Sequence, residues 1–322
     1  MNLFRRLLTL AFAALPLLAA AQAWPTKPIK LILPLPPGGQ TDAVVRYYAQ
    51  KAEATLGQPF VIENKPGVNT MIGTQEVARA PADGYTLLFN MTAIVSNPVL
   101  MPATAKYDAL QDFVPIYRAY ELYAVFAVPA SAPYKTLAEF VAAAKASAQP
   151  FTYGTTGHAS SSHYFVEMLA KQAKLTMVHV PYKGDSAAVM DVVAGNVDLS
   201  FSTVSATLSL IQAGKLRAIA MTGLQRSQSL PDVPTLDETV LKGFNADTWV
   251  GLFAPARTPD PIIKRLYEAT KVALADPDVA KKLIAGGNNI VGNDTAQFRA
   301  FLAAESKKWG EVIRAGNIKL DE

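Results

Sequence analysis

The sequence predicts an α/β protein with two lobes, and two observations lead to this fold class. Short strands of apolar residues alternate with helical patterns, and the alternation forms two blocks, roughly 24–123 and 124–245. The strands are apolar on both faces, which is typical of parallel sheets that helices cover on two sides. Because half of the 322 residues are hydrophobic, the chain can bury a sizeable core.

Short runs rich in apolar and β-branched residues predict the strands of both blocks. In chain order these runs are Ile29–Leu33, Phe60–Glu63, Tyr85–Phe89, Leu122–Val128, Met177–Val180, Val197–Phe201 and Leu216–Thr222. The segments between them predict helices over Ala43–Leu56, Thr74–Ala80, Leu137–Ala146, Ser162–Ala173 and Ala187–Ala194. Gly57 and Gly195 lie where helix C-caps are expected, because glycine readily adopts the left-handed conformation found there.

The remainder of the chain is expected to hold one more strand and then only helices. The predicted elements are the strand Thr248–Ala254 and the helices Pro261–Leu274, Asp278–Ala285 and Thr295–Arg314. A helical tail with no sheet of its own must pack on an earlier block. We expect it to return to the first block, so that domain 1 comprises 24–123 and 247–322 and domain 2 comprises 124–246. The crossings near 121–126 and 245–250 are then the expected hinges.

Residues 1–23 predict a cleavable signal peptide. Two arginines precede an apolar run from Leu7 to Ala21, and Ala21-Gln22-Ala23 fits the small-x-small cleavage rule. The run, about 15 residues, is short for a membrane span and contains Pro16, so cleavage is favoured over a membrane anchor. We therefore expect a mature chain that begins at Trp24 and is exported to the periplasm.

The composition excludes several classes of function. The chain has no cysteine, so it forms no disulfide, Fe–S cluster or thiol nucleophile. Its net charge is only +4 and the charges are scattered, so we expect no nucleic-acid partner. Neither GxGxxG, GxxxxGK[ST] nor GxSxG occurs, and His158, His163 and His179 match no zinc motif. We expect no cofactor, no metal and no catalytic residue.

The most informative stretch is LILPLPPGGQTD, from Leu31 to Asp42, in which a strand runs through a Pro/Gly turn into a helix that starts near Thr41. Gly38 and Gly39 lack Cβ atoms, so a ligand can approach the backbone closely there. The free N–H groups of the turn and of the first helical turn, together with the helix dipole, form an anion site that needs no charged side chain.

A second loop of the same kind lies in the second block, where TYGTTGHASSSH spans Thr152 to His163. Gly154 and Gly157 lack Cβ atoms and so leave the backbone accessible. The hydroxyl residues around them offer further hydrogen bonds. Each block therefore carries one strand–turn–helix anion site. Two α/β lobes with facing helix N-termini form the kind of cleft found in solute-binding proteins, since ligands of open α/β sheets bind beyond the carboxyl ends of the strands.

The chain also resembles the Bug family, the extracytoplasmic solute receptors of tripartite tricarboxylate transporters. The resemblance runs through essentially the whole mature chain in family order. It includes WPTKPIKLILPLPPGGQTD (24–42), LGQPFVIENKPG (56–67), YGTTGHASSSH (153–163), HVPYKGDSAAVMDVVAGNVDLSF (179–201) and WVGLFAPARTPDPI (249–262).

The resemblance implies a two-lobed periplasmic-binding-protein fold of type II with a ligand cleft between the lobes. It implies a monomer that binds a small carboxylate with a pincer of two loops, Pro34–Asp42 and Tyr153–Ser162, and that delivers it to transporter membrane subunits. The expected ligand-binding residues are Leu35, Pro37, Gly38, Gly39, Gln40, Thr41, Asn90, Thr92, Thr155, Thr156, Gly157, Ser160, Ser161, Tyr182, Ser202 and Thr203.

Ligand identity and the downstream partner stay open at this stage. The chain has Leu35 where the family often has Phe, Ser202 where it often has an acid or amide, and a divergent segment over 90–97. The sequence is compatible with an aliphatic mono-, di- or tricarboxylate and with an aromatic acid. A receptor that presents its ligand to a sensor kinase would need the same pocket as a transport receptor, and the genomic neighbourhood would discriminate between them.

Other polar and aromatic residues are expected to have structural roles. Asp42 is expected to interact with the helix N-terminus, because it would repel a ligand carboxylate at close range. His179 lies in an apolar strand and is interpreted as structural. Lys183 is interpreted as a solvated side chain rather than as a positive group that attracts ligand at the mouth of the cleft. The aromatic cluster near the expected hinge is interpreted as core packing rather than as a wall of the ligand site; it comprises Tyr117, Tyr120, Tyr123 and Phe126.

Overall fold

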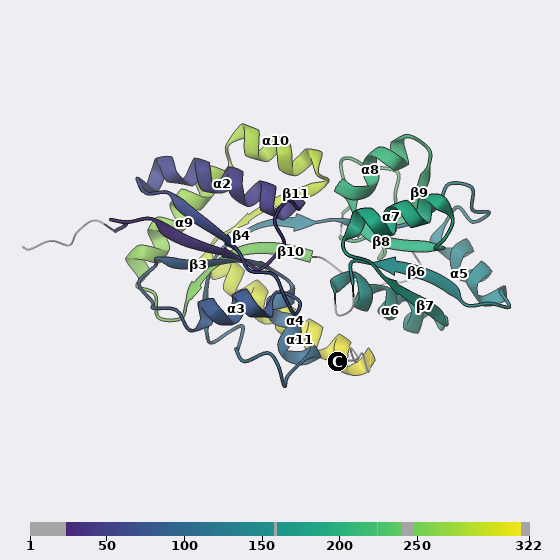
Figure 1. The fold of residues 1–322 in the computed structure, drawn as a ribbon, viewed down its shortest axis with the longest axis horizontal. Helices are drawn as coiled ribbons and strands as arrows, with labels where there is room; N and C mark the ends of the chain where they lie inside the picture. The colour runs from purple at the N-terminus through teal and green to yellow at the C-terminus, as the bar shows by residue number, and fades with distance from the viewer. Residues whose placement is uncertain (1–23, 158–159, 224, 240–247, 317–322) are drawn as a thin grey trace, which may run out of the picture.

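The computed structural model describes residues 24–157, 160–223, 225–239 and 248–316, which form two α/β lobes (Figure 1). Each lobe is built around its own sheet, and helices cover both faces of each sheet. The expected signal peptide, His158 and the part of the second crossing before residue 248 lie outside the described residues.

The first lobe contains a six-stranded mixed sheet with the order β11-β4-β10-β3-β1-β2. Its strands are β1 (Ile29–Leu33), β2 (Phe60–Asn64), β3 (Thr86–Met91), β4 (Phe113–Leu122), β10 (Thr248–Pro255) and β11 (Asn288–Asn293). Strand β1 pairs in parallel with β2 and β3, whereas β10 is antiparallel to both β3 and β4. The expectation of a purely parallel sheet is therefore wrong, because β10 enters the sheet beside β3 in the opposite direction.

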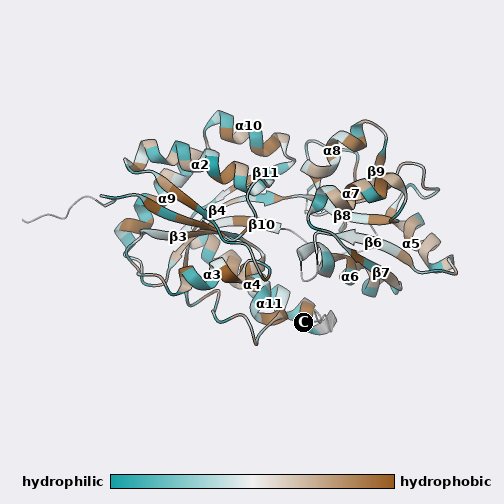
Figure 2. Cartoon of the chain, viewed as in Figure 1, coloured by the Kyte–Doolittle hydropathy of each residue, from teal (hydrophilic) through white to brown (hydrophobic). Residues whose placement is uncertain are grey.

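Helices lie on both faces of this sheet, as the alternation along β1 requires. Leu31 packs in the core beneath α2 and α9, while its neighbour Ile32 packs in the core beneath α3, α4 and α11. The helices are α2 (Gln40–Leu56), α3 (Met71–Ala78), α4 (Ala93–Leu100), α9 (Asp260–Leu274), α10 (Pro277–Ala285) and α11 (Thr295–Gly316). Figure 2 shows hydrophobic colour on the strands beside β3 and both hydrophilic and hydrophobic colour on α2 and α10.

The second lobe contains a five-stranded mixed sheet with the order β7-β6-β8-β5-β9. Its strands are β5 (Ala124–Pro129), β6 (Phe151–Thr155), β7 (Met177–Pro181), β8 (Leu199–Thr203) and β9 (Leu216–Met221). Its helices are α5 (Leu137–Ala146), α6 (Ser161–Ala173), α7 (Asp185–Ala194) and α8 (Val204–Gln212). Strand β6 is parallel to β7 and β8, and β5 is antiparallel to β8 and β9.

The predicted strand Leu122–Val128 is in fact the crossing between the lobes. Strand β4 ends at Leu122 in the first sheet and β5 begins at Ala124 in the second sheet, with Tyr123 between them. The Tyr123 carbonyl accepts a hydrogen bond from Val204 N–H at 3.0 Å instead of continuing a ladder. The residues from Leu122 to Val128 are all buried and apolar or aromatic, so hydrophobic periodicity alone shows no boundary at Tyr123.

The helical tail also contains a strand that the sequence analysis missed. Strand β11 pairs antiparallel with β4, with Asn288 opposite Leu122 and Ile290 opposite Tyr120. Its sequence, NNIVGN, is poor in strand-forming residues, so tertiary pairing overrides local propensity here. The tail packs on the first sheet through β11, α9 and α11. This supports the proposed division into domain 1 (24–123 and 247–322) and domain 2 (124–246).

Two helices end at the glycines that the sequence analysis expected as C-caps. Gly57 and Gly195 end α2 and α7 in the left-handed conformation, with φ of 76° and 78°. The sequence analysis did not predict the helices α4 and α8 or the strand β4. The sequence of β4, FVPIYRAYEL, mixes apolar residues with Pro115, Arg118 and Glu121, so it shows no clear strand pattern. Within the described residues, no helix is long and apolar enough to cross a membrane.

Candidate functional site

A cleft of about 1080 Å³ lies between the two lobes. Its walls are five short segments, 34–42, 66–70, 160–162, 183–186 and 201–206, together with a few single residues. Each segment follows the carboxyl end of a strand that takes part in a parallel pair: β1, β2, β6, β7 and β8. This is the position where open α/β sheets bind ligands.

Most of the predicted ligand-binding residues line this cleft. They are Leu35, Pro37, Gly38, Gly39, Gln40, Thr41, Thr156, Ser160, Ser161, Ser202 and Thr203. The other predicted residues are not among those that line it: Asn90, Thr92, Thr155, Gly157 and Tyr182. Asn90 donates to the Thr74 hydroxyl and Thr92 accepts from Trp249 N–H, while the Tyr182 hydroxyl donates to Asp191.

The first loop presents an open backbone to the cleft. Gly38 has φ of +86° and Gly39 caps α2 without a side-chain hydrogen bond, and a Cβ added at either glycine would meet no atom within 4 Å. Helix α2 starts at Gln40, so the N–H groups of its first turn have no partner within the helix. These amides and the helix dipole favour an anion at this wall.

Asp42 fixes the shape of this loop and uses one of the amides expected to bind ligand. Its carboxylate accepts hydrogen bonds from Gly38 N–H at 3.0 Å, from Arg46 at 3.0 Å and from Asn64 Nδ2 at 2.9 Å. The Gly38 amide is therefore not available to a ligand, which corrects the expectation that all N–H groups of the turn are free. Burial acts to raise the pKa of Asp42, but the hydrogen bonds from Arg46, Asn64 and Gly38 outweigh it and the pKa is lowered.

The hydroxyl groups of the second loop largely form hydrogen bonds within the loop itself. Ser160 caps α6 by accepting from His163 N–H at 3.3 Å, and its own hydroxyl donates to Gly157 O at 2.6 Å. The Ser162 hydroxyl accepts from Thr156 N–H at 3.0 Å. These bonds hold the loop in shape, so the first-turn amides of α6 are the donors that this wall offers to an anion.

Two histidines support the second loop from behind. The rings of His163 and His179 are stacked with centroids 3.8 Å apart, and His179 Nε2 lies 2.6 Å from the Thr155 hydroxyl. Thr155 Oγ1 in turn accepts from Gly157 N–H at 3.2 Å. The structural role that we expected for His179 is therefore to position this loop. The sequence did not reveal the contact with Thr155 through which it does so.

A third wall, which the sequence analysis did not include, is the loop before α3. Gly67, Val68, Asn69 and Thr70 all have positive φ, at 137°, 43°, 50° and 75°. A β-branched residue in this region is an outlier, and such strain is concentrated at functional sites. Asn97 holds the loop, since its Nδ2 donates to Asn69 O at 2.6 Å. Single-residue propensities give no signal for such a run.

The start of α7 supplies a fourth wall that was also missed. Lys183 is exposed there, and Asp185 is partly exposed and accepts from the Thr203 hydroxyl at 2.7 Å and from Thr203 N–H at 3.2 Å. Burial raises the pKa of the Asp185 carboxyl, and the hydrogen bonds from Thr203 and Ser202 only partly offset this. Lys183 and Asp185 come directly after the strand β7, and this position after a parallel strand was the available signal.

The two lobes touch at one end of the cleft. Gln40 of the first lobe bridges them, since its Oε1 accepts from the Ser205 hydroxyl of the second lobe at 2.7 Å. Its Nε2 donates to Gly286 O of its own lobe at 3.1 Å. Beside it, a Cβ added at Gly287 would lie 2.3 Å from Val204, so the turn before β11 packs closely against the second lobe.

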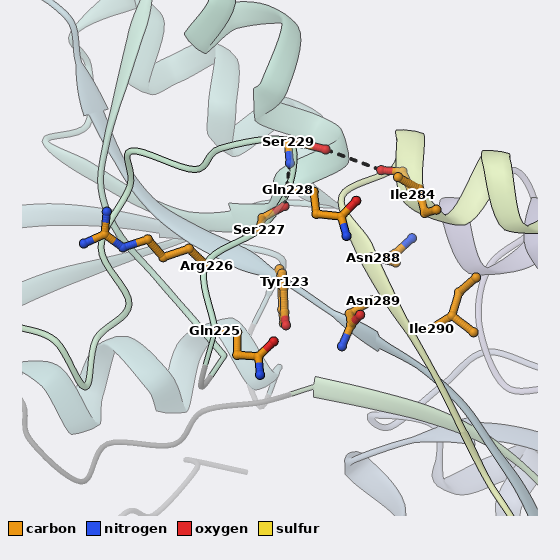
Figure 3. A pocket seen from close by; sticks show the side chains of 10 residues that line it. All are labelled: Tyr123, Gln225, Arg226, Ser227, Gln228, Ser229, Ile284, Asn288, Asn289 and Ile290. Atoms are coloured by element: carbon orange, nitrogen blue, oxygen red, sulfur yellow. Dashed lines mark hydrogen bonds between the residues drawn. The ribbon is translucent and has the colours of Figure 1, made fainter.

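A smaller pocket of about 170 Å³ lies on the other side of this contact (Figure 3). Tyr123 of the crossing faces it, with Gln225 to Ser229 on one side and Asn288 to Ile290 on the other. The Ser229 hydroxyl donates to Ile284 O at 3.4 Å across the lobes. This pocket therefore lies at the boundary between the lobes, beside the crossing at Tyr123.

The aromatic residues near the hinge pack as expected in the cores. Tyr117, Tyr120, Tyr123 and Phe126 are buried, and none of them lines the main cleft. Burial raises the pKa values of Tyr117 and Tyr120. In the described part of the chain, no group of three or more histidine or acidic side chains is arranged to hold a metal ion.

The chain is similar to known proteins over most of its length. A family model described as "Tripartite tricarboxylate transporter family receptor" matches residues 44–318. The UPF0065 protein in the tcbD-tcbE intergenic region of Pseudomonas sp. (strain P51) is 35% identical over 292 residues, covering 90% of this chain and 87% of that protein. Protein BugT of Bordetella pertussis is 32% identical over 313 residues, covering 97% of this chain and 96% of BugT.

Solved structures of relatives have the same fold. The periplasmic binding protein BugD has a TM-score of 0.81 at 30% identity, covering 92% of this chain and 99% of BugD. Rpa4515 of R. palustris with adipate has a TM-score of 0.81 at 28% identity, with coverages of 92% and 99%. MatC (Rpa3494) from Rhodopseudomonas palustris with bound malate has a TM-score of 0.79 at 28% identity, with coverages of 90% and 100%.

Proposed function

Because this chain belongs to the tripartite tricarboxylate transporter receptor family, we propose that it is a periplasmic receptor that captures a small carboxylate between its two lobes and delivers it to transporter membrane subunits. Proteins of this family and the structural neighbours with bound acids are solute-binding receptors rather than enzymes. The neighbours hold adipate and malate, both small carboxylates.

The observation that carries the proposal is the pair of helix N-termini that face one cleft from different lobes. Helix α2 begins at Gln40 beside the open backbone of Gly39, and α6 begins at Ser161 beside its cap Ser160. Each terminus presents amides that lack intrahelical partners, and a carboxylate accepts several such hydrogen bonds at once. A ligand that contacts both lobes stabilises the closed state, because it binds that state more tightly.

The charge of the cleft suits a small anion rather than a polyanion. Lys183 is the one cationic side chain among the described lining residues, and it is exposed. Recognition therefore depends on oriented amides, which bind one or two carboxylate groups well but do not neutralise many charges. The signal peptide expected at 1–23 supports a periplasmic location, and we propose that the receptor acts there as a monomer.

The proposal predicts that carboxylates stabilise the full mature chain and that their amides do not. A thermal-unfolding screen should contain aliphatic acids, aromatic acids and the amide of each acid. A ligand that binds only the folded state adds about 2.7 kcal/mol at a hundredfold excess over Kd. This corresponds to a shift of a few degrees in a chain of this length. Calorimetry on each hit then measures affinity.

The amide controls decide the result. Stabilisation by acids and not by their amides supports the anion site formed by the helix N-termini. Equal stabilisation by acids and amides would show that the amides of α2 and α6 do not select a charged group. A comparison of aromatic with aliphatic acids shows whether Leu35 leaves room for a ring beside the first loop.

A further inference from the structure

Asp185 places a carboxylate in the wall of a cleft that is otherwise built to attract anions. It is the first residue of α7, after Gly184, which has φ of 109°. The hydroxyl and N–H of Thr203 both donate to one of its oxygens, Oδ2, at 2.7 and 3.2 Å. The Ser202 hydroxyl is a further, weaker donor to this carboxyl, and no hydrogen bond of ordinary geometry to the other oxygen, Oδ1, is found among the described residues.

The other acidic residue of the cleft differs from Asp185 in this respect. Both oxygens of Asp42 are occupied, and Arg46 neutralises its charge through an ion pair of 3.0 Å. Asp185 forms no ion pair within the described part of the chain, and the exposed Lys183 near it does not pair with it. The buried Ser202 hydroxyl, which lines the same wall, makes no hydrogen bond of ordinary geometry with any described residue.

This asymmetry restricts the ligand group that can lie beside Asp185. A second carboxylate there would face a like charge in a partly buried site, where charge repulsion is stronger than in water. An ammonium, hydroxyl or amide group would instead donate to Oδ1 and form a charge-assisted hydrogen bond. Hydrogen-bonding sites discriminate strongly, because a mismatched ligand leaves a buried polar group unpaired.

We propose that Asp185 determines the specificity of the cleft by selecting carboxylates whose other end donates a hydrogen bond, such as amino, hydroxy or amide acids, over dicarboxylates. The inference rests on the proposed function, since it assumes that the helix N-termini of α2 and α6 hold one carboxylate of the ligand.

The test uses ligands that differ only at the end opposite the carboxylate. The six-carbon series is hexanoate, 6-hydroxyhexanoate, 6-aminohexanoate and adipate, and the four-carbon series is butyrate, 4-hydroxybutyrate, 4-aminobutyrate and succinate. Calorimetry on the wild-type chain should show that the best donor-bearing acid of a series binds at least tenfold tighter than its dicarboxylate. In Asp185→Asn this ratio should fall at least tenfold, because the negative charge is gone.

Asp278→Asn is the matched control, because it removes an exposed carboxylate from the first turn of α10, outside the cleft. It should leave the ratio unchanged. Asp185→Ser repeats the test with a side chain that can still accept from Thr203, and circular dichroism selects the folded variant of the two. A role of Asp185 in stability alone would change the unfolding temperature without changing the ratio between ligands.

The outcomes separate this inference from the proposed function. If the wild type binds carboxylates but prefers the dicarboxylate of each series, or if its preference persists in the Asp185 variants, the inference is overturned and the carboxylate receptor remains. If no acid of either series or of the wider carboxylate screen binds the wild type, both are overturned. A loss of preference in the Asp185 variants, with the Asp278→Asn control unaffected, supports the inference.

Discussion

Two aspartates of the cleft show how environment sets the role of a residue. Asp42 accepts hydrogen bonds from Arg46, Asn64 and Gly38, which lower its pKa despite burial. Asp185 has only Thr203 as a strong partner, and burial raises its pKa. The first side chain is therefore a fixed part of the loop, while the second retains an oxygen for the ligand. Residue type alone does not distinguish the two roles.

Replacing Asp42 with asparagine should destabilise the protein at neutral pH and not in acid. The lowered pKa means that the folded state favours the carboxylate. Its stabilisation is therefore fully present above the ordinary value of about 3.9 and is lost as the pH falls through the lower folded pKa. We expect a loss of about 1.5–3 kcal/mol at pH 7, typical of hydrogen bonds to a charged group.

Urea unfolding of wild type and Asp42→Asn at pH 7 and at about pH 3 measures this difference. The Asp278→Asn variant serves as the control, because its side chain is 78% exposed and lies outside the cleft. A difference that is as large in acid as at pH 7 would contradict the assigned role of the Asp42 charge.

Replacing Gly39 with valine should abolish ligand binding and preserve the fold. Gly39 has φ of −75° and ψ of 168°, a conformation that any residue adopts, and an added Cβ meets no atom within 4 Å. The new branches therefore project into the cleft, and we expect at least a tenfold loss of affinity by calorimetry. Gly38→Val should also lose stability, because φ there is +86°.

The control for Gly39→Val is Ala54→Val, which adds the same branches to the exposed face of α2 away from the cleft. It should bind as the wild type does. Unchanged affinity in a folded Gly39→Val protein would mean that the first loop does not contact the ligand.

At the scale of elements, the walls of the cleft are loops that rigid strands and helices hold in unusual shapes. The loop 67–70 keeps four successive residues at positive φ, with Asn97 of α4 bonded to its backbone. The second loop is held by its own hydroxyls and by the stacked histidines behind it. Such pre-organised loops lose little conformational entropy on binding, which favours affinity.

Replacing Val68 with asparagine should stabilise the protein by about 1 kcal/mol. Val68 has φ of 43°, which is strained for a β-branched residue, whereas asparagine adopts the left-handed region readily. Its side chain is 50% exposed, so little apolar burial is lost. The free energy of unfolding in urea measures the gain.

Val61→Asn is the matched control for this prediction. Val61 is 48% exposed and lies in the extended strand β2, where valine is favoured and asparagine is not. The same substitution should therefore lower the free energy of unfolding there. A loss at both positions would show that Val68 is not strained in solution.

At the scale of the whole molecule, the lobes are joined by crossings and by contacts at one end of the cleft. Tyr123 separates β4 from β5, and Gln40 and Gly287 contact Ser205 and Val204 of the other lobe. Trp309 of α11 also packs against Phe165 of α6, with ring centroids 5.4 Å apart. We expect the crossings to act as hinges between the lobes.

Ligand binding should reduce the radius of gyration of the mature chain. A carboxylate held by α2 and α6 contacts both lobes, and such a ligand shifts the equilibrium toward the closed state by its differential affinity. Small-angle scattering with and without a saturating hit from the carboxylate screen measures the change. Gly39→Val at the same ligand concentration is the control and should keep the unliganded profile. An unchanged wild-type profile at saturation would rule out lobe closure as the response to ligand.

The sequence by itself determined the α/β class, most strands and helices, and the two glycine-bearing loops, because local periodicity and turn residues specify these features directly. Three features were decided by the tertiary structure alone. Leu122 and Ala124 belong to different sheets, and the weak strand β11 pairs with β4. Asp185 enters the cleft beside Thr203. These features depend on residues far apart in the chain, and their free energy comes from pairing and burial that no local pattern records. For the same reason the charge that faces the ligand becomes visible only when the carboxyl ends of strands from both lobes meet.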